Sequence, residues 1–235
     1  MTIEIYSSKK QHILYDADRL SQIDATFFQP DDWREEGRVS EPSGGRGQAF
    51  FIQHPDGYEY LLRHYRRGGL IAKVSQDGYL FTGLKQSRPF AEFQLTHDLF
   101  QAGLPVPQPL AARVMRRGLL YTGDLATLKI PDARPFADYL TDNQHNAIWQ
   151  AVGAMIQRFH LWGLNHVDLN ANNILVDSTG KCWLIDFDRC RKMPADGPAD
   201  WQAGNLERLK RSIRKLTGEN IRNNLWQALL NGYKS

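Results

Sequence analysis

The sequence predicts an α+β protein with two lobes, the first rich in strands and the second rich in helices. Up to about residue 124, short apolar runs alternate with glycine- and proline-containing turns. After about residue 132, apolar residues recur at helical spacing. The 235 residues, of which 42% are hydrophobic, are enough to form two cores. We therefore expect one domain over residues 1–235, with a first lobe over about 1–124, a hinge over about 123–131 and a second lobe over about 132–235.

The first lobe is expected to contain several short strands. Ile3 and Ile5 alternate with polar residues, which is typical of an edge strand. The His-Pro-Asp-Gly turn at residues 54–57 separates two apolar runs and predicts a hairpin. The expected strands are 3–5, 48–53, 58–65, 110–115 and 119–122.

Two helices and two irregular segments complete the first lobe. Residues 30–37 predict a short acidic helix ended by glycine, and residues 87–103 predict a longer helix that also stops at glycine. Prolines at alternate positions then favour extended backbone. We expect a loop over residues 66–81 and a linker over residues 123–131.

The second lobe is expected to be mainly helical. Ile148, Val152, Met155 and Phe159 recur at helical spacing and predict a buried helix that ends near residue 163. The elements expected after it are two short strands, 174–176 and 183–187, and two helices, 201–216 and 220–230.

Two acid-containing segments at the start of the second lobe carry the chemistry. The chain reads His-Val-Asp-Leu-Asn-Ala-Asn-Asn-Ile-Leu-Val from His166 and Trp-Leu-Ile-Asp-Phe-Asp from Trp183. Asp168 precedes Asn173 by five residues, and Asp186 follows Asn173 by thirteen. In phosphoryl transfer an aspartate in the first position is the general base, while the asparagine and the second aspartate hold magnesium on the nucleotide phosphates.

Each of these residues alone would be an ordinary turn residue, but their combination favours catalysis. Magnesium is a hard cation that requires oxygen ligands, which these side chains supply. The sequence therefore predicts Asp168 as the catalytic base and Asn173 and Asp186 as metal ligands. His166 is expected to hydrogen-bond the loop as a scaffold.

A basic residue paired with Glu92 is expected to contact the nucleotide phosphates. Glu92 lies on the helix that follows the hairpin, where kinases place a glutamate that pairs with a strand lysine. Here Arg63 ends the strand, and a guanidinium can bind phosphate oxygens in a fork. Lys73 is an alternative partner, and a solvated helix-face charge is the alternative role for Glu92.

Gly44, Gly45 and Gly47 precede the hairpin and could let backbone N–H groups approach phosphates. The segment lacks the full Gly-x-Gly-x-x-Gly pattern, so an ordinary turn is the alternative. Its position before Arg63 favours a phosphate-covering loop.

The charge pattern is compatible with an anionic partner. The net charge is +3, with basic residues clustered around residues 63–73 and 208–215. A solvated surface is the ordinary explanation, and a surface for an anionic acceptor or anionic lipid is the alternative. The second cluster lies on a predicted helix with an apolar side formed by Trp201, Leu206, Leu209, Ile213 and Leu216.

Several classes of protein are disfavoured. Cys182 and Cys190 are too few for a disulfide framework, and they lack companions for a zinc site. The N-terminus lacks the apolar core of a signal peptide, and no stretch approaches the roughly 20 apolar residues of a membrane span. We therefore expect a protein that is cytoplasmic or peripheral to a membrane. Aromatic residues are not interleaved with the basic runs, so no nucleic-acid partner is expected.

These positions resemble the protein-kinase-like superfamily and, within it, the small bacterial lipopolysaccharide-core kinases that act on 3-deoxy-D-manno-octulosonic acid (Kdo). The resemblance is carried by residues 62–69, 91–95 and 103–107 together with the two acid-containing segments. It implies a bilobal protein-kinase-like fold with a reduced helical second lobe and nucleotide in the interlobe cleft. It further implies ATP- and Mg2+-dependent phosphorylation of the 4-hydroxyl of Kdo on a Kdo–lipid A precursor, at the cytoplasmic face of the bacterial inner membrane.

Departures from typical protein kinases disfavour a protein substrate. Val167 replaces the arginine that senses a phosphorylated activation loop, Asn170 replaces a lysine, and Asp188 replaces a glycine. No Ala-Pro-Glu segment follows, so the helices that grip protein substrates are expected to be missing.

Two other functions stay open. A small-molecule phosphotransferase of the aminoglycoside or choline type uses a similar Asp-x-x-x-x-Asn loop, although the basic loop suits an anionic sugar acid better. A pseudokinase-like membrane scaffold would use the basic C-terminal helices. The filled Asp168, Asn173 and Asp186 positions argue against the scaffold.

Overall fold

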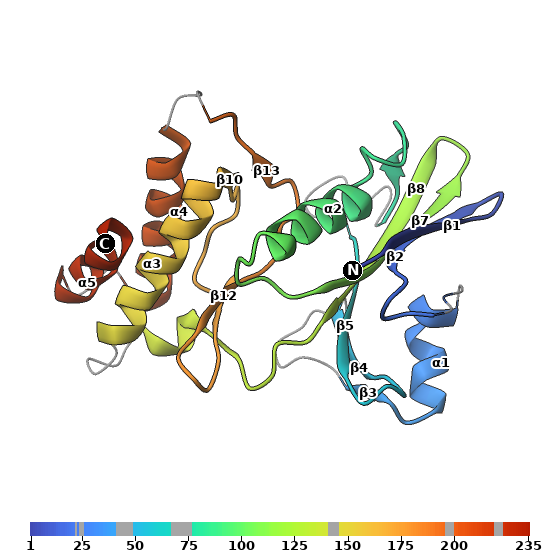
Figure 1. Cartoon of the computed structure of the whole chain (residues 1–235), viewed down its shortest axis with the longest axis horizontal. Coiled ribbons are helices and arrows are strands. Elements are labelled where there is room, and N and C mark those ends of the chain that lie inside the picture. The colour runs from blue at the N-terminus through green and yellow to red at the C-terminus, as the bar shows by residue number, and fades with distance from the viewer. Residues whose placement is uncertain are drawn as a thin grey trace. The chain divides into compact units, whose positions relative to one another are not determined.

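The computed structural model describes residues 1–21, 23, 26–40, 49–66, 77–140, 146–195, 200–218 and 223–235. The chain forms two compact units, which are described separately (Figure 1). The N-terminal unit contains residues 1–97 and 108–129, and the C-terminal unit contains residues 98–107 and 130–235. The first is built on a large sheet and the second mainly on helices, which confirms the predicted α+β class.

The N-terminal unit is built on an antiparallel sheet with the strand order β1-β2-β7-β8-β5-β4-β3, and β6 also pairs with β8. The order confirms β1 as an edge strand and β4–β5 as a hairpin. The strands are β1 (Ile3–Ser7), β2 (Gln11–Asp16), β3 (Val39–Ser40), β4 (Ala49–Gln53), β5 (Glu59–His64), β6 (Tyr79–Leu80), β7 (Pro109–Arg117) and β8 (Leu120–Leu128).

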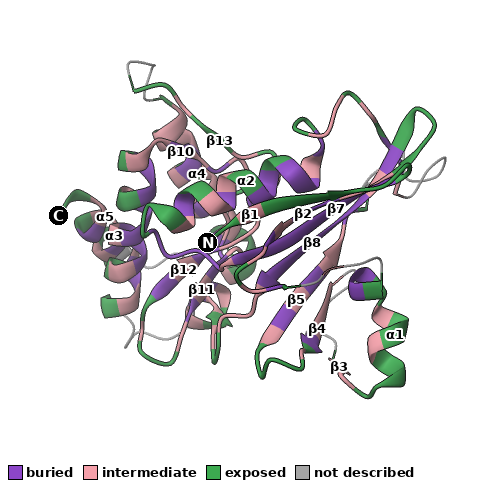
Figure 2. Cartoon of the chain, turned by 45° about the vertical axis from the view of Figure 1, so that its right-hand side comes forward, coloured by how far each residue is buried: buried purple, intermediate pink, exposed green. Residues whose placement is uncertain are grey.

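Both faces of this sheet are buried. Successive residues of a strand point to opposite faces, and Ile13 and Leu14 of β2 accordingly belong to different core clusters. Phe28 of the short helix η1 (Thr26–Phe28) joins the cluster of Ile13, beside α1 (Pro30–Glu35). Phe93 of α2 (Arg88–Gln101) joins the cluster of Leu14. The buried residues of the central strands are visible in Figure 2.

Residues 123–128 are strand rather than linker, so the expected linker over 123–131 is wrong in this part. Gly123 and Asp124 resemble turn residues, but both lie within β8 for tertiary reasons. A Cβ atom at Gly123 would lie 2.3 Å from Cγ of Pro89, so glycine is needed for close packing against α2. Asp124 is buried and accepts a hydrogen bond from Nε of Arg113 (2.8 Å).

Two strands were not predicted. β2 carries the polar residues Gln11 and His12, which hide its apolar alternation. β6 falls in the expected loop over residues 66–81, of which 67–76 lie outside the described residues. Its two residues are strand only because they pair with Leu120 and Tyr121 of β8, and such pairing is not visible in a short segment.

The C-terminal unit packs three helices with two small sheets. α3 is the predicted buried helix, and the last two helices also occur close to their predicted positions. The second expected strand, 183–187, is displaced to Cys182–Leu184, where it pairs with Ile174–Val176. The elements are α3 (Asn146–Trp162), α4 (Asp200–Thr217), α5 (Asn223–Lys234), η3 (Phe136–Tyr139), the sheet of β12 (Cys182–Leu184), β11 (Ile174–Val176) and β9 (Arg134–Pro135), and the pair β10 (Leu164–Asn165) and β13 (Arg191–Lys192).

Helices α3 and α5 pack closely at two glycines. A Cβ atom at Gly153 would lie 1.9 Å from the carbonyl oxygen of Leu229, and one at Gly232 would lie 2.0 Å from that of Gln150. Backbone atoms cannot move aside as a side chain can. The absence of side chains at these two positions therefore sets the distance between the helices.

A hydrogen-bond chain joins all three helices. The Arg208 guanidinium donates to Oδ1 of Asn205 (3.0 Å), which directs the amide nitrogen toward Nε2 of His160 (3.3 Å). Nδ1 of His160 then donates to the hydroxyl of Tyr233 (2.7 Å). Because Nε2 accepts, the ring is neutral, and burial lowers the pKa of His160 to about 4.

We expect Gly153→Ala to destabilise the C-terminal unit by about 3 kcal/mol, because the added methyl would force α3 and α5 apart. Gly204→Ala is the matched control. Gly204 also lies in a helix, and a Cβ atom there would meet nothing within 4 Å. Its substitution should stabilise the protein by about 1 kcal/mol through helix propensity. Urea unfolding of both variants tests this, and equal effects would contradict the packing role.

Stability should fall as the pH decreases from about 6.5 toward about 4. In this window the unfolded state protonates His160 whereas the folded state does not, so protons favour unfolding. The depressed pKa corresponds to about 3 kcal/mol over the window. The pH dependence of urea unfolding should be flatter in His160→Gln than in the parent protein. Parallel pH profiles would show that His160 does not titrate in this way.

Candidate active site

The loop from His166 to Asn173 is held by its own asparagines. Oδ1 of Asn170 accepts the backbone N–H groups of Asn172 (2.9 Å) and Asn173 (3.2 Å). The side-chain amides of Asn170 and Asn173 both donate to the carbonyl oxygen of Asp168, each at 3.0 Å. The loop is therefore rigid around Asp168, whose side chain remains exposed.

The end of β12 ties this loop to Asp186. The N–H of Ile185 donates to the carbonyl oxygen of Asn173 (3.0 Å), and Nε2 of His166 donates to the carbonyl oxygen of Ile185 (3.1 Å). Ile185 is thus bonded at both polar groups, and Asp186 is the next residue. The Nδ2 atom of Asn173 also lies 3.4 Å from Oδ2 of Asp168. The structure brings the three predicted residues together at one edge of the C-terminal unit.

His166 is a scaffold residue, as predicted. It is 2% exposed, and its ring packs edge-on against Phe187 with centroids 5.6 Å apart. Burial lowers the pKa of His166, so the ring is neutral at physiological pH. Its Nδ1 atom has no hydrogen-bond partner among the residues that the structure describes.

Asp186 has an unusual backbone conformation. Its φ angle is +64°, in the left-handed region that side chains other than glycine and asparagine seldom adopt. Such strain costs on the order of 1 kcal/mol and persists only where the surroundings impose it. The hydrogen bonds of Ile185 impose it here, and they turn the chain sharply where the acid leaves the strand.

The donor set fits magnesium. Two carboxylates and one amide offer oxygen atoms, the ligands that Mg2+ prefers. The amide nitrogen of Asn173 is engaged by Asp168, so its Oδ1 atom is the one left to bind a cation. Within the described ranges no group of three His, Cys, Asp or Glu residues forms a metal site of another kind. Magnesium bound here would complete its coordination with phosphate and water oxygens.

In the N-terminal unit Arg63 and Glu92 form the expected pair. Nη2 of Arg63 lies 2.6 Å from both carboxylate oxygens of Glu92. Glu92 is 4% exposed, so a solvated helix-face charge is excluded. The hydroxyl of Tyr65 also donates to this carboxylate. Sequence reasoning missed Tyr65, although its position two residues after Arg63 places both side chains on one side of the chain.

A second buried acid lies beside this pair on β8. Asp124 accepts from Nε of Arg113 (2.8 Å) and from Nδ1 of His64 (2.7 Å). The hydrogen bond to Asp124 is the main cause of the raised pKa of His64. These contacts join β5, β7 and β8 and hold the strand that presents Arg63.

The other predicted site residues separate into three groups. Gly44, Gly45, Gly47 and Lys73 lie outside the described residues. Burial raises the pKa of Cys182 to about 12, which confirms it as a core residue rather than a nucleophile. The remaining group, the apolar side of α4, is mostly used in the core.

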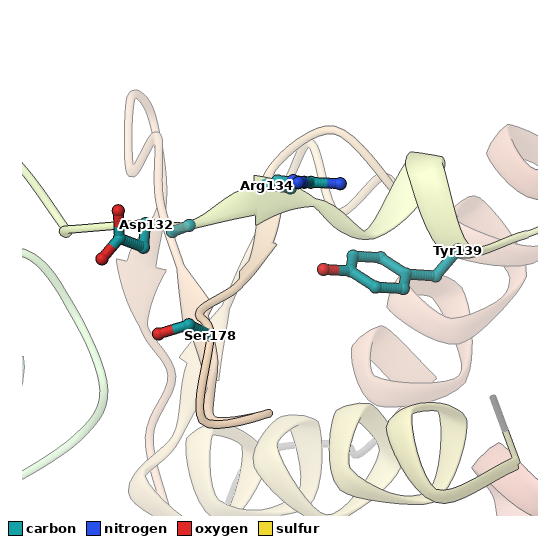
Figure 3. Close-up of a pocket in the computed structure, with 5 residues that line it drawn as sticks. Asp132, Arg134, Tyr139 and Ser178 are labelled. Atoms are coloured by element: carbon teal, nitrogen blue, oxygen red, sulfur yellow. The ribbon is translucent and has the colours of Figure 1, made fainter.

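A polar hollow of about 520 Å³ lies elsewhere in the C-terminal unit, lined by Asp132, Ala133, Arg134, Tyr139 and Ser178 (Figure 3). Ser178 follows β11, whereas Asn173 precedes it. At about 3.3 Å per residue, the strand separates the hollow from the acid cluster by roughly 15 Å. The hollow is therefore not the predicted metal site.

Comparison with known proteins accounts for this arrangement. The family model of the lipopolysaccharide kinases (Kdo/WaaP) matches residues 31–233. This chain belongs to the Kdo/WaaP lipopolysaccharide kinase family. Family membership makes it a kinase, as the acid cluster predicted.

Individual relatives support the assignment. The chain is 45% identical over 211 residues to a 3-deoxy-D-manno-octulosonic acid kinase of Xanthomonas euvesicatoria pv. vesicatoria (strain 85-10), covering 89% of this chain and 83% of the relative. It is 48% identical over 209 residues to the enzyme of that name from Stenotrophomonas maltophilia (strain R551-3), covering 88% and 82%.

A solved structure confirms the protein-kinase-like fold. The Rio2 kinase of Chaetomium thermophilum, in an ADP/Mg2+-phosphoaspartate complex, superposes with a TM-score of 0.51 and 17% sequence identity. The alignment covers 86% of this chain and 68% of that one. At this identity the likeness concerns the fold alone.

We expect Arg63→Met to destabilise the N-terminal unit by about 3 kcal/mol, because it leaves the buried Glu92 carboxylate without its cation. Arg63→Lys is the matched control. One nitrogen of Arg63 contacts both oxygens, a geometry that an ammonium can reproduce, so the loss should be below about 1.5 kcal/mol. Thermal and urea unfolding measure both. Equal stability of Arg63→Met and the parent would contradict a structural role for the pair.

Proposed function

We propose that this protein transfers the γ-phosphoryl group of ATP to the 4-hydroxyl of a Kdo sugar on a Kdo–lipid A precursor, in lipopolysaccharide core synthesis. The hydrogen-bonded cluster of Asp168, Asn173 and Asp186, in a member of this kinase family, carries the proposal. The names of the relatives support Kdo as the acceptor sugar.

Asp168 is the proposed general base. Its carboxylate is exposed, while its backbone carbonyl is held by two asparagine amides. The position of the carboxylate is thus fixed without its desolvation, so it stays ionised and able to accept a proton from the acceptor hydroxyl. Such a base orients the hydroxyl for in-line attack on the γ-phosphorus.

Asn173 and Asp186 are the proposed metal ligands. When bound, Mg2+ neutralises charge on the triphosphate and orients the transferred group. The residues themselves contribute rigidity. Asn173 is bonded through its side chain to Asp168 and through its backbone to Ile185, and both bonds orient its free amide oxygen.

Arg63 is the proposed contact to the nucleotide phosphates, with Glu92 and Tyr65 as the residues that position it. The glutamate is too buried to meet a ligand in bulk water, so its effect is to hold the guanidinium in place. The guanidinium is partly exposed, and hydrogen bonds from nitrogen atoms other than Nη2 could reach phosphate oxygens.

We further propose that the protein acts as a peripheral enzyme at the cytoplasmic face of the bacterial inner membrane. Its proposed acceptor is an anionic glycolipid of that membrane, and its proposed phosphoryl donor is a cytoplasmic nucleotide. Among the described residues, no helix has the length and apolar character needed to span a bilayer.

We expect Asp168→Asn to lower kcat for phosphoryl transfer by about 100- to 10,000-fold, because the acceptor hydroxyl loses its base. The assay follows transfer of label from ATP, with Mg2+, to a Kdo-bearing lipid A precursor. The fold should be retained because the asparagine amides bind the backbone of residue 168. Asp138→Asn, an exposed acid of η3, is the matched control and should keep full activity.

Three results would contradict the proposal. Undiminished transfer by Asp168→Asn would remove the assigned base. Transfer to aminoglycosides or choline but not to the Kdo lipid would indicate a small-molecule phosphotransferase. Nucleotide binding without transfer to any acceptor would indicate a scaffold protein.

A further inference from the structure

Three chain segments meet at one end of the N-terminal sheet. They are the β1–β2 turn, the β7–β8 turn and β6. The N–H of Arg116 donates to the carbonyl oxygen of Lys10 (2.7 Å), and that of Phe81 donates to the carbonyl oxygen of Leu119 (2.9 Å). Figures 1 and 2 both show the turns of β1–β2 and β7–β8 at the same end of the sheet. We call the exposed residues here the tip surface: Lys9, Lys10, Leu80, Arg116, Arg117, Leu119 and Leu120.

The tip surface concentrates positive charge. Lys9, Lys10, Arg116 and Arg117 line a hollow of about 720 Å³ with Met115 and Gly118. None of these four cations forms a salt bridge within the part of the chain that the structure describes. Residues 5–15, 78–88 and 114–123, which contain the three segments, include no aspartate or glutamate. Four cations thus lie together in a chain whose net charge is only +3.

The same surface exposes three leucines. Leu119 is 76% exposed, Leu80 is 62% exposed and Leu120 is 42% exposed. Leu80 and Leu120 are cross-strand partners, as are Arg117 and Leu120, so these three side chains lie on one face of the sheet. Leu119 occupies the apex, beside Gly118 with its φ of +64°. A cluster of exposed leucines indicates a contact surface rather than scattered surface residues.

We infer that the tip surface docks on an anionic lipid bilayer. Leucines at the apex of turns can enter the boundary between headgroups and acyl chains, while lysine and arginine side chains bind the phosphates above them. Both components are needed for stable binding of a protein without a membrane span, and this surface has both. The inference rests on the proposed function only in giving the docking a purpose, since a docked enzyme would meet an acceptor embedded in the membrane.

The basic helix α4 is the rival surface, and it lacks one component. Leu209 and Ile213 on its apolar side are fully buried in the core, so they are not available to enter a membrane. Lys210 lies over the ring of Trp226, and Arg208 bonds Asn205. The cations of α4 therefore serve partly within the unit itself. This contrast makes α4 the matched control for the tip surface.

The test measures co-sedimentation of the full chain with vesicles of phosphatidylethanolamine and phosphatidylglycerol. A tip variant combines Lys9→Ser, Lys10→Ser, Arg117→Ser and Leu119→Ser, and it leaves Arg116, which stacks on Phe81, unchanged. The control variant combines Arg211→Ser and Lys215→Ser on α4, at two exposed positions. We expect the tip variant to lose about 100-fold in vesicle partitioning and the control less than about threefold. Thermal unfolding verifies that both variants fold.

Further arms separate the outcomes. Binding of the parent protein should weaken with salt and be largely absent on phosphatidylcholine vesicles. With a water-soluble Kdo acceptor the tip variant should keep parental activity, and with the acceptor in vesicles it should lose most of it. If the parent phosphorylates no acceptor, the proposed function fails while the vesicle result still decides this inference.

The inference is overturned if the tip variant binds anionic vesicles like the parent, or if the α4 control loses binding instead. It is also overturned if the tip substitutions abolish a dimer, measured by light scattering, without changing vesicle binding. The surface would then be an interface with a second copy of the chain.

Discussion

The arrangement of the acid cluster depends on the two hydrogen bonds of Ile185. Its N–H is bonded to the carbonyl oxygen of Asn173, and its carbonyl oxygen is bonded to the ring of His166. These two residues are the ends of the loop that carries Asp168. One residue of a short strand therefore fixes both ends of the loop and the position of Asp186. Because backbone groups cannot choose other partners once buried, the three acidic and amide side chains are held in place without contacting one another strongly.

The N-terminal unit solves a different physical problem, that of buried charge. Glu92 and Asp124 are almost inaccessible to water, and an unpaired carboxylate there would cost several kcal/mol. Each is paired with an arginine and accepts a second hydrogen bond from a ring residue, Tyr65 or His64. All of these side chains come from the strands β5, β7 and β8 or from α2. The pairs thus stabilise the strand that presents Arg63 while they direct its guanidinium.

Charge alone does not distinguish the two basic regions of the molecule. α4 and the tip surface both carry several cations, but their apolar residues have opposite environments. In α4 these residues are mainly core, and at the strand turns they are in water. A sequence pattern of basic and apolar residues is the same in both situations. Only the tertiary structure shows which apolar residues remain to contact a partner.

The amino-acid sequence by itself determined the fold class, the long helices and the chemistry of the acid cluster. Amphipathic periodicity over a helix such as α3 reflects burial of one continuous face, so it is visible locally. The roles proposed for Asp168, Asn173 and Asp186 depend on residue type and spacing, which are also local. The pair Arg63–Glu92 was predicted because the resemblance to kinases supplied a long-range contact that spacing alone does not give.

Tertiary structure alone decided the features that depend on contacts between distant residues. β6 exists only through pairing with β8, and Gly123 and Asp124 are strand residues because Pro89 and Arg113 approach them. The same holds for Tyr65 and for the meeting of three strand turns at the tip surface. Burial and pairing are properties of the folded chain, and neighbouring residues in the sequence carry no record of which distant side chain will supply them.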